Sequence, residues 1–117
     1  MALDQHIFSE TAVGTDSGAS ATHAAEAITD SEPNTSITVN RTHVVTSISG
    51  HTDADSIITI ESPASTVVWQ SKIDVSVEGT SFNFPGIAVE GVPGSAILGK
   101  IASSSSDCQV NISGVTR

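Results

Sequence analysis

Residues 66–78, with the sequence TVVWQSKIDVSVE, alternate apolar and polar side chains more regularly than the rest of this chain. Because successive side chains of a β-strand point to opposite faces, the alternation predicts a single strand with one apolar and one polar face. The apolar face would carry Val67, Trp69, Ile73, Val75 and Val77. Trp69 is the only tryptophan, and a buried ring of that size is among the largest single apolar contributions that the chain can make. We therefore expect this stretch to form the centre of the core.

Similar short segments, separated by turn residues, surround this stretch from residue 36 to the C-terminus. They cover residues 36–40, 43–49, 56–61, 81–84, 95–102 and 108–114. Several alternating segments with turn signals between them predict an all-β domain over residues 36–117, a small antiparallel β-sandwich or jelly-roll-like barrel. The remaining residues of its predicted core are Ile58, Ile60, Phe82, Phe84, Val110 and Ile112.

Residues 1–35 differ from this pattern. They are rich in Gly, Ser and Ala, and they contain acidic residues but no Lys or Arg. A segment with so little apolar surface is expected to become ordered only against another surface. We therefore predict an extended, mostly irregular N-terminal arm, whose contacts with a partner are made by Ile7, Phe8, Val13 and Ile28.

The charge of the chain excludes some classes of partner. It has 13 acidic and 4 basic residues, for a net charge of −9. Nucleic-acid affinity comes largely from Lys and Arg, so we expect no nucleic-acid binding. No apolar run approaches the roughly 20 residues that span a bilayer, and the first residues do not have the pattern of a signal peptide, so no membrane association is expected. Cys108 is the only cysteine, which predicts a small buried residue rather than a disulfide partner.

Motifs that carry chemistry are scarce. The chain has no Gly-x-Ser-x-Gly elbow, no phosphate-binding Gly-rich loop, no Cys pair and no His-Glu-x-x-His motif, so we expect neither an enzyme nor a cofactor. His51, Asp53 and Asp55 share one loop and are the best metal candidates, but three ligands from one loop are too few for a closed site. A polar turn is therefore the expected role of that loop.

The other three histidines, His6, His23 and His43, have no ligand at a suitable sequence spacing. We expect them to lie in the arm or on the surface of a strand. A symmetric trimer could bring three copies of one histidine together on its axis, and the sequence neither favours nor excludes that arrangement.

The order of the segments resembles that of a group of small tailed-phage virion proteins of the capsid decoration, or cement, type. The matching succession is HVVTSI at 43–48, IITI at 57–60, VVW at 67–69 with Ile73-Asp74, FNF at 82–84, GVPGSA at 91–96 and VNI at 110–112. It covers about residues 43–115. The resemblance implies a β-sandwich that assembles as a trimer at capsid symmetry axes, with terminal arms that reach neighbouring subunits.

On these grounds we expect a non-enzymatic structural protein on the capsid exterior of a phage particle. Its partner would be the major capsid protein, and it would bridge and stabilise neighbouring capsomers as a homotrimer. The alternative is a sugar- or receptor-binding β module of a fibre or adhesin, although one Trp, three Phe and no Tyr leave few aromatic rings for stacking on a sugar. A structural domain of a tail or neck is a third possibility.

Overall fold

The computed structural model describes residues 5–14, 18–32, 35–102 and 107–117, which form ten strands and one short helix. In chain order the elements are β1 His6–Gly14, β2 Ala19–His23, β3 Ala27–Glu32, β4 Thr35–Asn40, β5 His43–Thr52, β6 Ser56–Glu61, β7 Val67–Ile73, α1 Val75–Glu78, β8 Ser81–Glu90, β9 Ile97–Ala102 and β10 Cys108–Thr116. No helix among these residues is long and apolar enough to cross a membrane.

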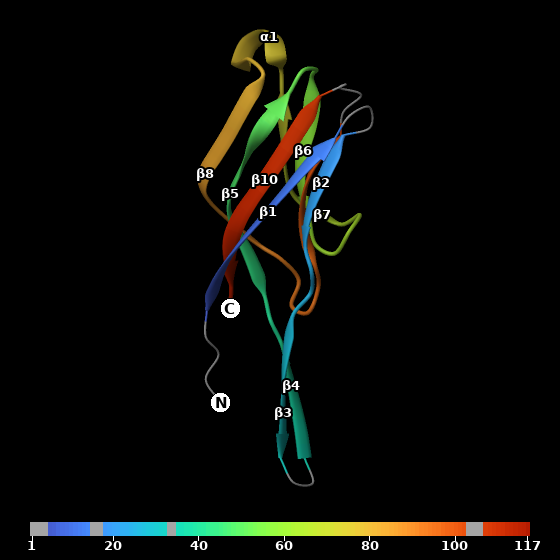
Figure 1. Cartoon of the computed structure of the whole chain (residues 1–117), viewed down its shortest axis with the longest axis vertical. Coiled ribbons are helices and arrows are strands. Elements are labelled where there is room, and N and C mark those ends of the chain that lie inside the picture. Colours follow the sequence, from blue (N-terminus) through green and yellow to red (C-terminus); the bar gives the residue numbers. More distant parts are fainter. Residues whose placement is uncertain (1–4, 15–17, 33–34, 103–106) are drawn as a thin grey trace.

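Eight of the strands form two antiparallel sheets that pack face to face (Figure 1). Sheet A has the strand order β1-β10-β5-β8, and sheet B has the order β2-β9-β6-β7. With the β3–β4 hairpin set aside and the other strands renumbered from one to eight, these orders become 1-8-3-6 and 2-7-4-5. That is the topology of a jelly roll, in which the chain crosses repeatedly between two sheets. The predicted all-β sandwich or jelly-roll-like fold is therefore confirmed.

The core lies between the two sheets and consists mainly of branched aliphatic side chains. Sheet A contributes Ile48, Val110 and Ile112, and sheet B contributes Ile58, Ile60, Ile97 and Ile101, all of them almost fully buried. The sheets approach closely at Gly99 of β9, where a Cβ atom would clash with the side chain of Ile112 on β10. Gly99 therefore lets the two central strands pack without a gap.

The remaining two strands, β3 and β4, form a hairpin that projects from one end of the sandwich (Figure 1). The hairpin is inserted between β2 of sheet B and β5 of sheet A, and it pairs with neither sheet. It accounts for much of the elongated shape of the molecule, which measures 61 × 25 × 19 Å. A backbone hydrogen bond of 2.9 Å from Arg41 N to Glu26 O joins its two ends.

The prediction of an irregular N-terminal arm was wrong for the described residues. β1 pairs with β10 along its whole length, and β2 pairs with β9, so both strands complete the jelly roll. Phe8, a predicted partner contact, is buried in the core of its own chain. Of the other predicted contacts, Ile7 and Val13 on β1 are exposed, and Ile28 lies half-buried on the projecting hairpin. Residues 1–4, 15–17 and 33–34 of the predicted arm lie outside the described residues.

The stretch 66–78 is also not one continuous strand. β7 ends at Ile73, and the carboxylate of Asp74 accepts hydrogen bonds from the backbone N of Ser76 at 3.0 Å and from its hydroxyl at 2.7 Å. These two hydrogen bonds lower the pKa of Asp74. Asp74 thereby caps the single turn of α1, since a carboxylate at this position satisfies a free helical N–H.

The change from strand to helix corrects part of the predicted core. Val77 is 77% exposed on α1, and Val67 is 50% exposed at the start of the edge strand β7, so neither belongs to the core. Trp69, Val75 and Phe84 are partly buried against it. The predicted core residues that are buried are Ile58, Ile60, Ile73, Phe82, Val110 and Ile112.

Trp69 connects β7 and β8, which are the edge strands of sheet B and sheet A on the side of the sandwich opposite β1 and β2. We call this side the open side of the sandwich. Loss of the Trp69 ring should destabilise the domain. Its ring packs edge-on against Phe84 of β8, with 5.3 Å between the ring centroids. We expect Trp69→Ala to lower the free energy of unfolding by about 2–4 kcal/mol, measured by urea denaturation, because a large, partly buried ring is removed. Val77→Ala on exposed α1 is the control and should change it by less than about 0.5 kcal/mol. Equal effects of the two substitutions would contradict the role given to Trp69.

Candidate functional site: a histidine cluster beside the hairpin

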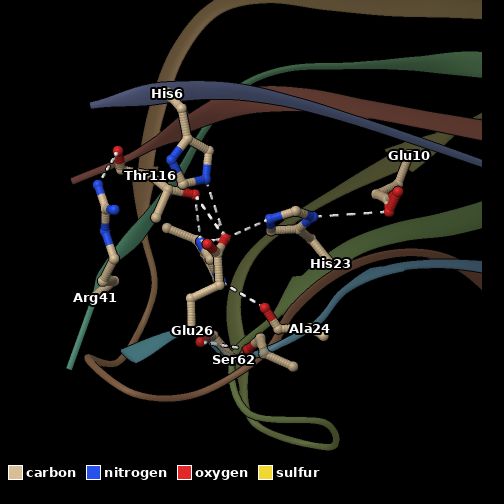
Figure 2. A network of polar contacts seen from close by, with 10 residues as sticks. His6, Glu10, His23, Ala24, Glu26, Arg41, Ser62 and Thr116 are labelled. Atoms are coloured by element: carbon tan, nitrogen blue, oxygen red, sulfur yellow. Dashed lines mark hydrogen bonds and ion pairs between the residues drawn. The ribbon is translucent and has the colours of Figure 1, made fainter. Parts of the chain in front are cut away.

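Three of the four histidines meet around the carboxylate of Glu26, where the hairpin leaves the sandwich (Figure 2). Glu26 Oε2 lies 2.9 Å from His23 Nε2, 3.2 Å from His6 Nε2 and 4.0 Å from His43 Nδ1. We call His6, His23, Glu26 and His43 the histidine cluster. Its members come from β1, β2, the β2–β3 connection and β5, so both sheets contribute.

The pairing of the strands explains why such distant residues meet. Thr116, near the end of β10, is paired with His6 of β1 on one side and with His43 of β5 on the other. The end of β2 in sheet B brings His23 to the same end of the sandwich, and Glu26 follows it three residues later. The cluster is therefore a consequence of the jelly-roll topology.

His43 is the buried member of the cluster. It has 0% exposure, and each of its ring nitrogens has a hydrogen-bond partner. Nε2 lies 2.8 Å from the carbonyl oxygen of Ala24, which can only accept, so Nε2 carries the proton. Nδ1 then accepts from the hydroxyl of Thr116 at 2.7 Å when the ring is neutral. Burial lowers the pKa of His43, although its hydrogen bond to Ala24 partly opposes that effect.

The carboxylate of Glu26 is stabilised by the rings around it. Partial burial raises the pKa of Glu26, but hydrogen bonds from His23 and His6 and the charges of both rings outweigh burial, so that the pKa is lowered. Glu26 is therefore ionised at neutral pH and presents a negative charge to the two histidines. The hydrogen bonds hold this charge in place at the base of the hairpin.

His23 is held in a defined orientation by its neighbours. Phe8 stacks on its ring with 4.3 Å between the centroids and an interplanar angle of 10°, and His43 packs edge-on at 4.6 Å. Its second nitrogen, Nδ1, lies 3.7 Å from Glu10 Oε2. His23 thus stands between two carboxylates, with Glu26 at one ring nitrogen and Glu10 at the other (Figure 2).

Thr116 and His43 of the cluster form a hydroxyl–imidazole pair, but the pair is not accessible to a substrate. The Thr116 hydroxyl and His43 Nδ1 have the separation of a nucleophile and its base. Both side chains are fully buried, however, and the second nitrogen of His43 is bonded to the backbone. The geometry therefore gives this pair a structural role, in which it joins the ends of β5 and β10.

The accessible members of the cluster can bind a cation. Among the described residues, His6, His23 and Glu26 form the one group of three metal-ligating side chains whose ligand atoms all lie within 4.8 Å of one another. The loop candidates do not meet in this way, because His51 pairs with Asp107 at 3.5 Å, whereas Asp55 accepts a hydrogen bond from Val75 N at 3.0 Å. The expectation that His43 lies on a strand surface was wrong, because its side chain points into the sandwich interior.

The thiol of Cys108 and a surface groove lie outside the histidine cluster. Cys108 is buried as expected, and burial raises the pKa of its thiol, which makes a reactive thiolate unfavourable. On the open side of the sandwich, β7 and β8 border a groove of about 270 Å³ lined by Ser71, Ile73, Ser81, Phe82, Asn83 and Phe84. None of these six side chains titrates near neutral pH.

We expect the domain to lose stability as the pH falls through the range in which His43 titrates. The pKa of His43 is below its ordinary value of 6.5 in the folded protein, so between these two values the unfolded chain binds more protons. The free energy of unfolding should therefore decrease as the pH is lowered from about 7.5 to about 5.5, as measured by urea denaturation in the presence of a chelator. Below the ordinary Glu26 pKa of 4.5, loss of that carboxylate should lower it further.

The substitution His43→Gln tests whether His43 causes this pH dependence of stability, because Gln retains polar atoms but does not titrate. The nearby charged groups Glu26, His23 and His6 are unchanged in this variant, so its shallower pH dependence would identify His43 as the source. If the free energy of unfolding depends equally steeply on pH in the wild-type protein and in His43→Gln, His43 is not the source of the pH dependence.

Comparisons with known proteins identify no relative of this chain. No family model matches it, and no curated protein or solved structure matches it significantly.

Proposed function

We propose that this chain is a non-enzymatic structural protein of a phage particle, a decoration protein on the capsid exterior that bridges neighbouring capsomers. Its partner is the major capsid protein, and the functional unit is a homotrimer. The observation that carries the proposal is the β3–β4 hairpin, which projects from a complete jelly roll. β3 and Ile28 lie within residues 1–35, so the proposed contact element includes part of the segment to which the sequence analysis gave that role.

The hairpin presents an apolar face that its own chain does not fully cover. Ile28 is paired with Val39 across the two strands, and Ile37 lies on the same face two residues before Val39. Ile37 is 55% exposed. On the opposite face Thr29 and Thr38 are exposed, with their hydroxyl oxygens 3.2 Å apart. Asp30 of β3 is paired with Ile37, so this face combines three aliphatic side chains with one acidic residue, whereas Thr29 and Thr38 place hydroxyls on the other face.

An isolated hairpin is marginally stable in water, which is a second reason to expect a partner. A third strand or a packed surface normally supplies the missing stability. A capsid surface beneath the apolar face would bury Ile37 and add interface area that the small sandwich does not provide by itself. Such a clamp strengthens a shell by contact alone and needs no chemistry.

The charge and composition of the chain support a position outside the shell. A net charge of −9 opposes contact with packaged nucleic acid. The low charged fraction of 15%, together with many Ser and Thr residues, is typical of hydroxyl-rich β-proteins on exposed surfaces. The resemblance of residues 43–115 to decoration proteins also supports a position on the capsid exterior. The proposals of a trimer and of the major capsid protein as partner come from this resemblance.

The groove between β7 and β8 supports one alternative, a sugar- or receptor-binding module of a fibre or adhesin. It combines the exposed amide of Asn83 with the ring of Phe84, and sugar sites pair polar groups with aromatic faces in this way. On this alternative, the wild-type protein binds a defined glycan on an array and Asn83→Ala abolishes the signal. Absence of any glycan signal for the wild-type protein rejects the alternative.

The hairpin proposal predicts that a single charge on the apolar face weakens capsid binding. Ile37→Asp should reduce binding to undecorated capsids by roughly 10- to 100-fold, because burial of an Ile side chain contributes about 1.5–3 kcal/mol. The measurement is co-sedimentation with capsids over a range of protein concentrations. The same preparation should have about three times the 11.9 kDa mass of the chain in light scattering.

Thr38→Asp is the matched control, since it adds the same charge to the adjacent, exposed position on the opposite face. It should bind like the wild-type protein. A second variant replaces residues 27–40 with two glycines, which the hydrogen bond between the ends of the hairpin makes geometrically feasible. If this variant remains folded and binds capsids normally, the hairpin is not the contact element.

A further inference from the structure

We propose that His6, His23 and Glu26 form a binding site for a divalent transition metal ion, specifically Zn²⁺. No sequence motif marks this site, because its ligands come from β1, from β2 and from the β2–β3 connection. The donors are two imidazole nitrogens and one carboxylate oxygen. This combination suits Zn²⁺, which binds His and Glu readily, better than Ca²⁺ or Mg²⁺, which prefer oxygen ligands only.

The spacing of the donor atoms is close to that of a zinc site. Bonds of about 2.0–2.1 Å in a tetrahedral arrangement place neighbouring ligand atoms about 3.3 Å apart. Glu26 Oε2 lies 2.9 Å from His23 Nε2 and 3.2 Å from His6 Nε2. All three ligand atoms lie within 4.8 Å of one another, so small side-chain rotations are enough to surround an ion.

A second carboxylate is placed where a metal-bound histidine needs one. A histidine that binds a metal through one nitrogen usually donates the proton on its other nitrogen to a carboxylate or carbonyl. Glu10 Oε2 lies 3.7 Å from His23 Nδ1, on the opposite side of the ring from Glu26. With the metal on Nε2, the proton of His23 resides on Nδ1 and faces Glu10. Glu10 is therefore a positioning residue for His23.

The site is pre-organised and also open to solvent. Stacking on Phe8 and packing against His43 fix the ring of His23. The side chains of His6 and Glu26 are 42% and 32% exposed, so an ion can enter and water can complete its coordination. Three protein ligands with a remaining open position are characteristic of accessible zinc sites.

The site lies where a bound metal ion would connect the hairpin to the sandwich. Glu26 directly precedes β3, and its backbone oxygen accepts the hydrogen bond from Arg41 N that joins the two ends of the hairpin. His6 and His23 belong to β1 and β2, the first strands of the two sheets. A bound ion would therefore tie the base of the hairpin to both sheets of the jelly roll.

The test is calorimetric titration of the full chain, purified without a polyhistidine tag, with ZnCl₂ at neutral pH. We expect saturable binding of one Zn²⁺ per chain and a higher thermal unfolding temperature in the presence of Zn²⁺ but not of Mg²⁺. His6→Gln and Glu26→Gln should each weaken binding at least roughly tenfold, since each removes a ligand. Glu10→Gln should retain the stoichiometry and weaken binding by about 10-fold, as expected when the partner of a ligating histidine is lost.

His51→Gln is the matched control, because His51 is also partly exposed and paired with a carboxylate, at Asp107, but lies outside the cluster. It should bind Zn²⁺ like the wild-type protein. Circular dichroism confirms that each variant is folded before titration. The proposal is overturned if the wild-type chain shows no saturable Zn²⁺ binding, or if His51→Gln weakens binding as much as His6→Gln does.

Discussion

The packing of sheet A against sheet B is the interaction on which every other feature of this protein depends. Ile48 and Ile112 on one sheet and Ile60 and Ile101 on the other are excluded from water, and each such side chain contributes about 1.5–3 kcal/mol when buried. A chain of 117 residues with a single cysteine has no disulfide of its own to support this layer. The contact between β9 and β10 at Gly99 shows how tightly the layer is packed.

This packing requires the N-terminal strands. Without β1 and β2, the strands β10 and β9 would become sheet edges with unpaired backbone groups, and Phe8 and Ala21 would leave the core. β1 and β2 are therefore part of the scaffold, and the hairpin inserted after them pairs with neither sheet. The proposed contact element is therefore the hairpin, and not the whole N-terminal segment that the composition suggested.

The same topology creates the histidine cluster. Because β1 and β5 flank β10, His6 and His43 come to lie on either side of Thr116, and the crossing to sheet B adds His23. The buried His43 holds two strand ends together, whereas His6, His23 and Glu26 remain accessible. Since Glu26 also marks the start of the hairpin, the proposed contact element and the proposed metal site share one structural base.

The sequence by itself determined the fold class and most of the core. Strict alternation in residues 108–112 places Val110 and Ile112 inside, because a strand with one covered face buries every second residue. The i, i+2 spacing of Ile58 and Ile60 places both of them on the buried face of β6. The same rule failed after Ile73, where the Asp74 side chain bonds to the backbone and starts a helical turn. The alternation of apolar and polar residues depends only on side-chain polarity, so it cannot predict the local hydrogen bonds that Asp74 makes with Ser76.

Only the tertiary structure showed that β1 and β2 belong to the two sheets and that the residues of the histidine cluster lie together. β1 and β2 are too polar to be recognised as strands alone, and their backbone groups become ordered by pairing with β10 and β9. The His6–Thr116 pairing joins residues at opposite ends of the chain, and no local pattern encodes such a register. Local side-chain chemistry thus specified the strands and their buried faces, whereas long-range hydrogen bonding between strands determined which side chains meet.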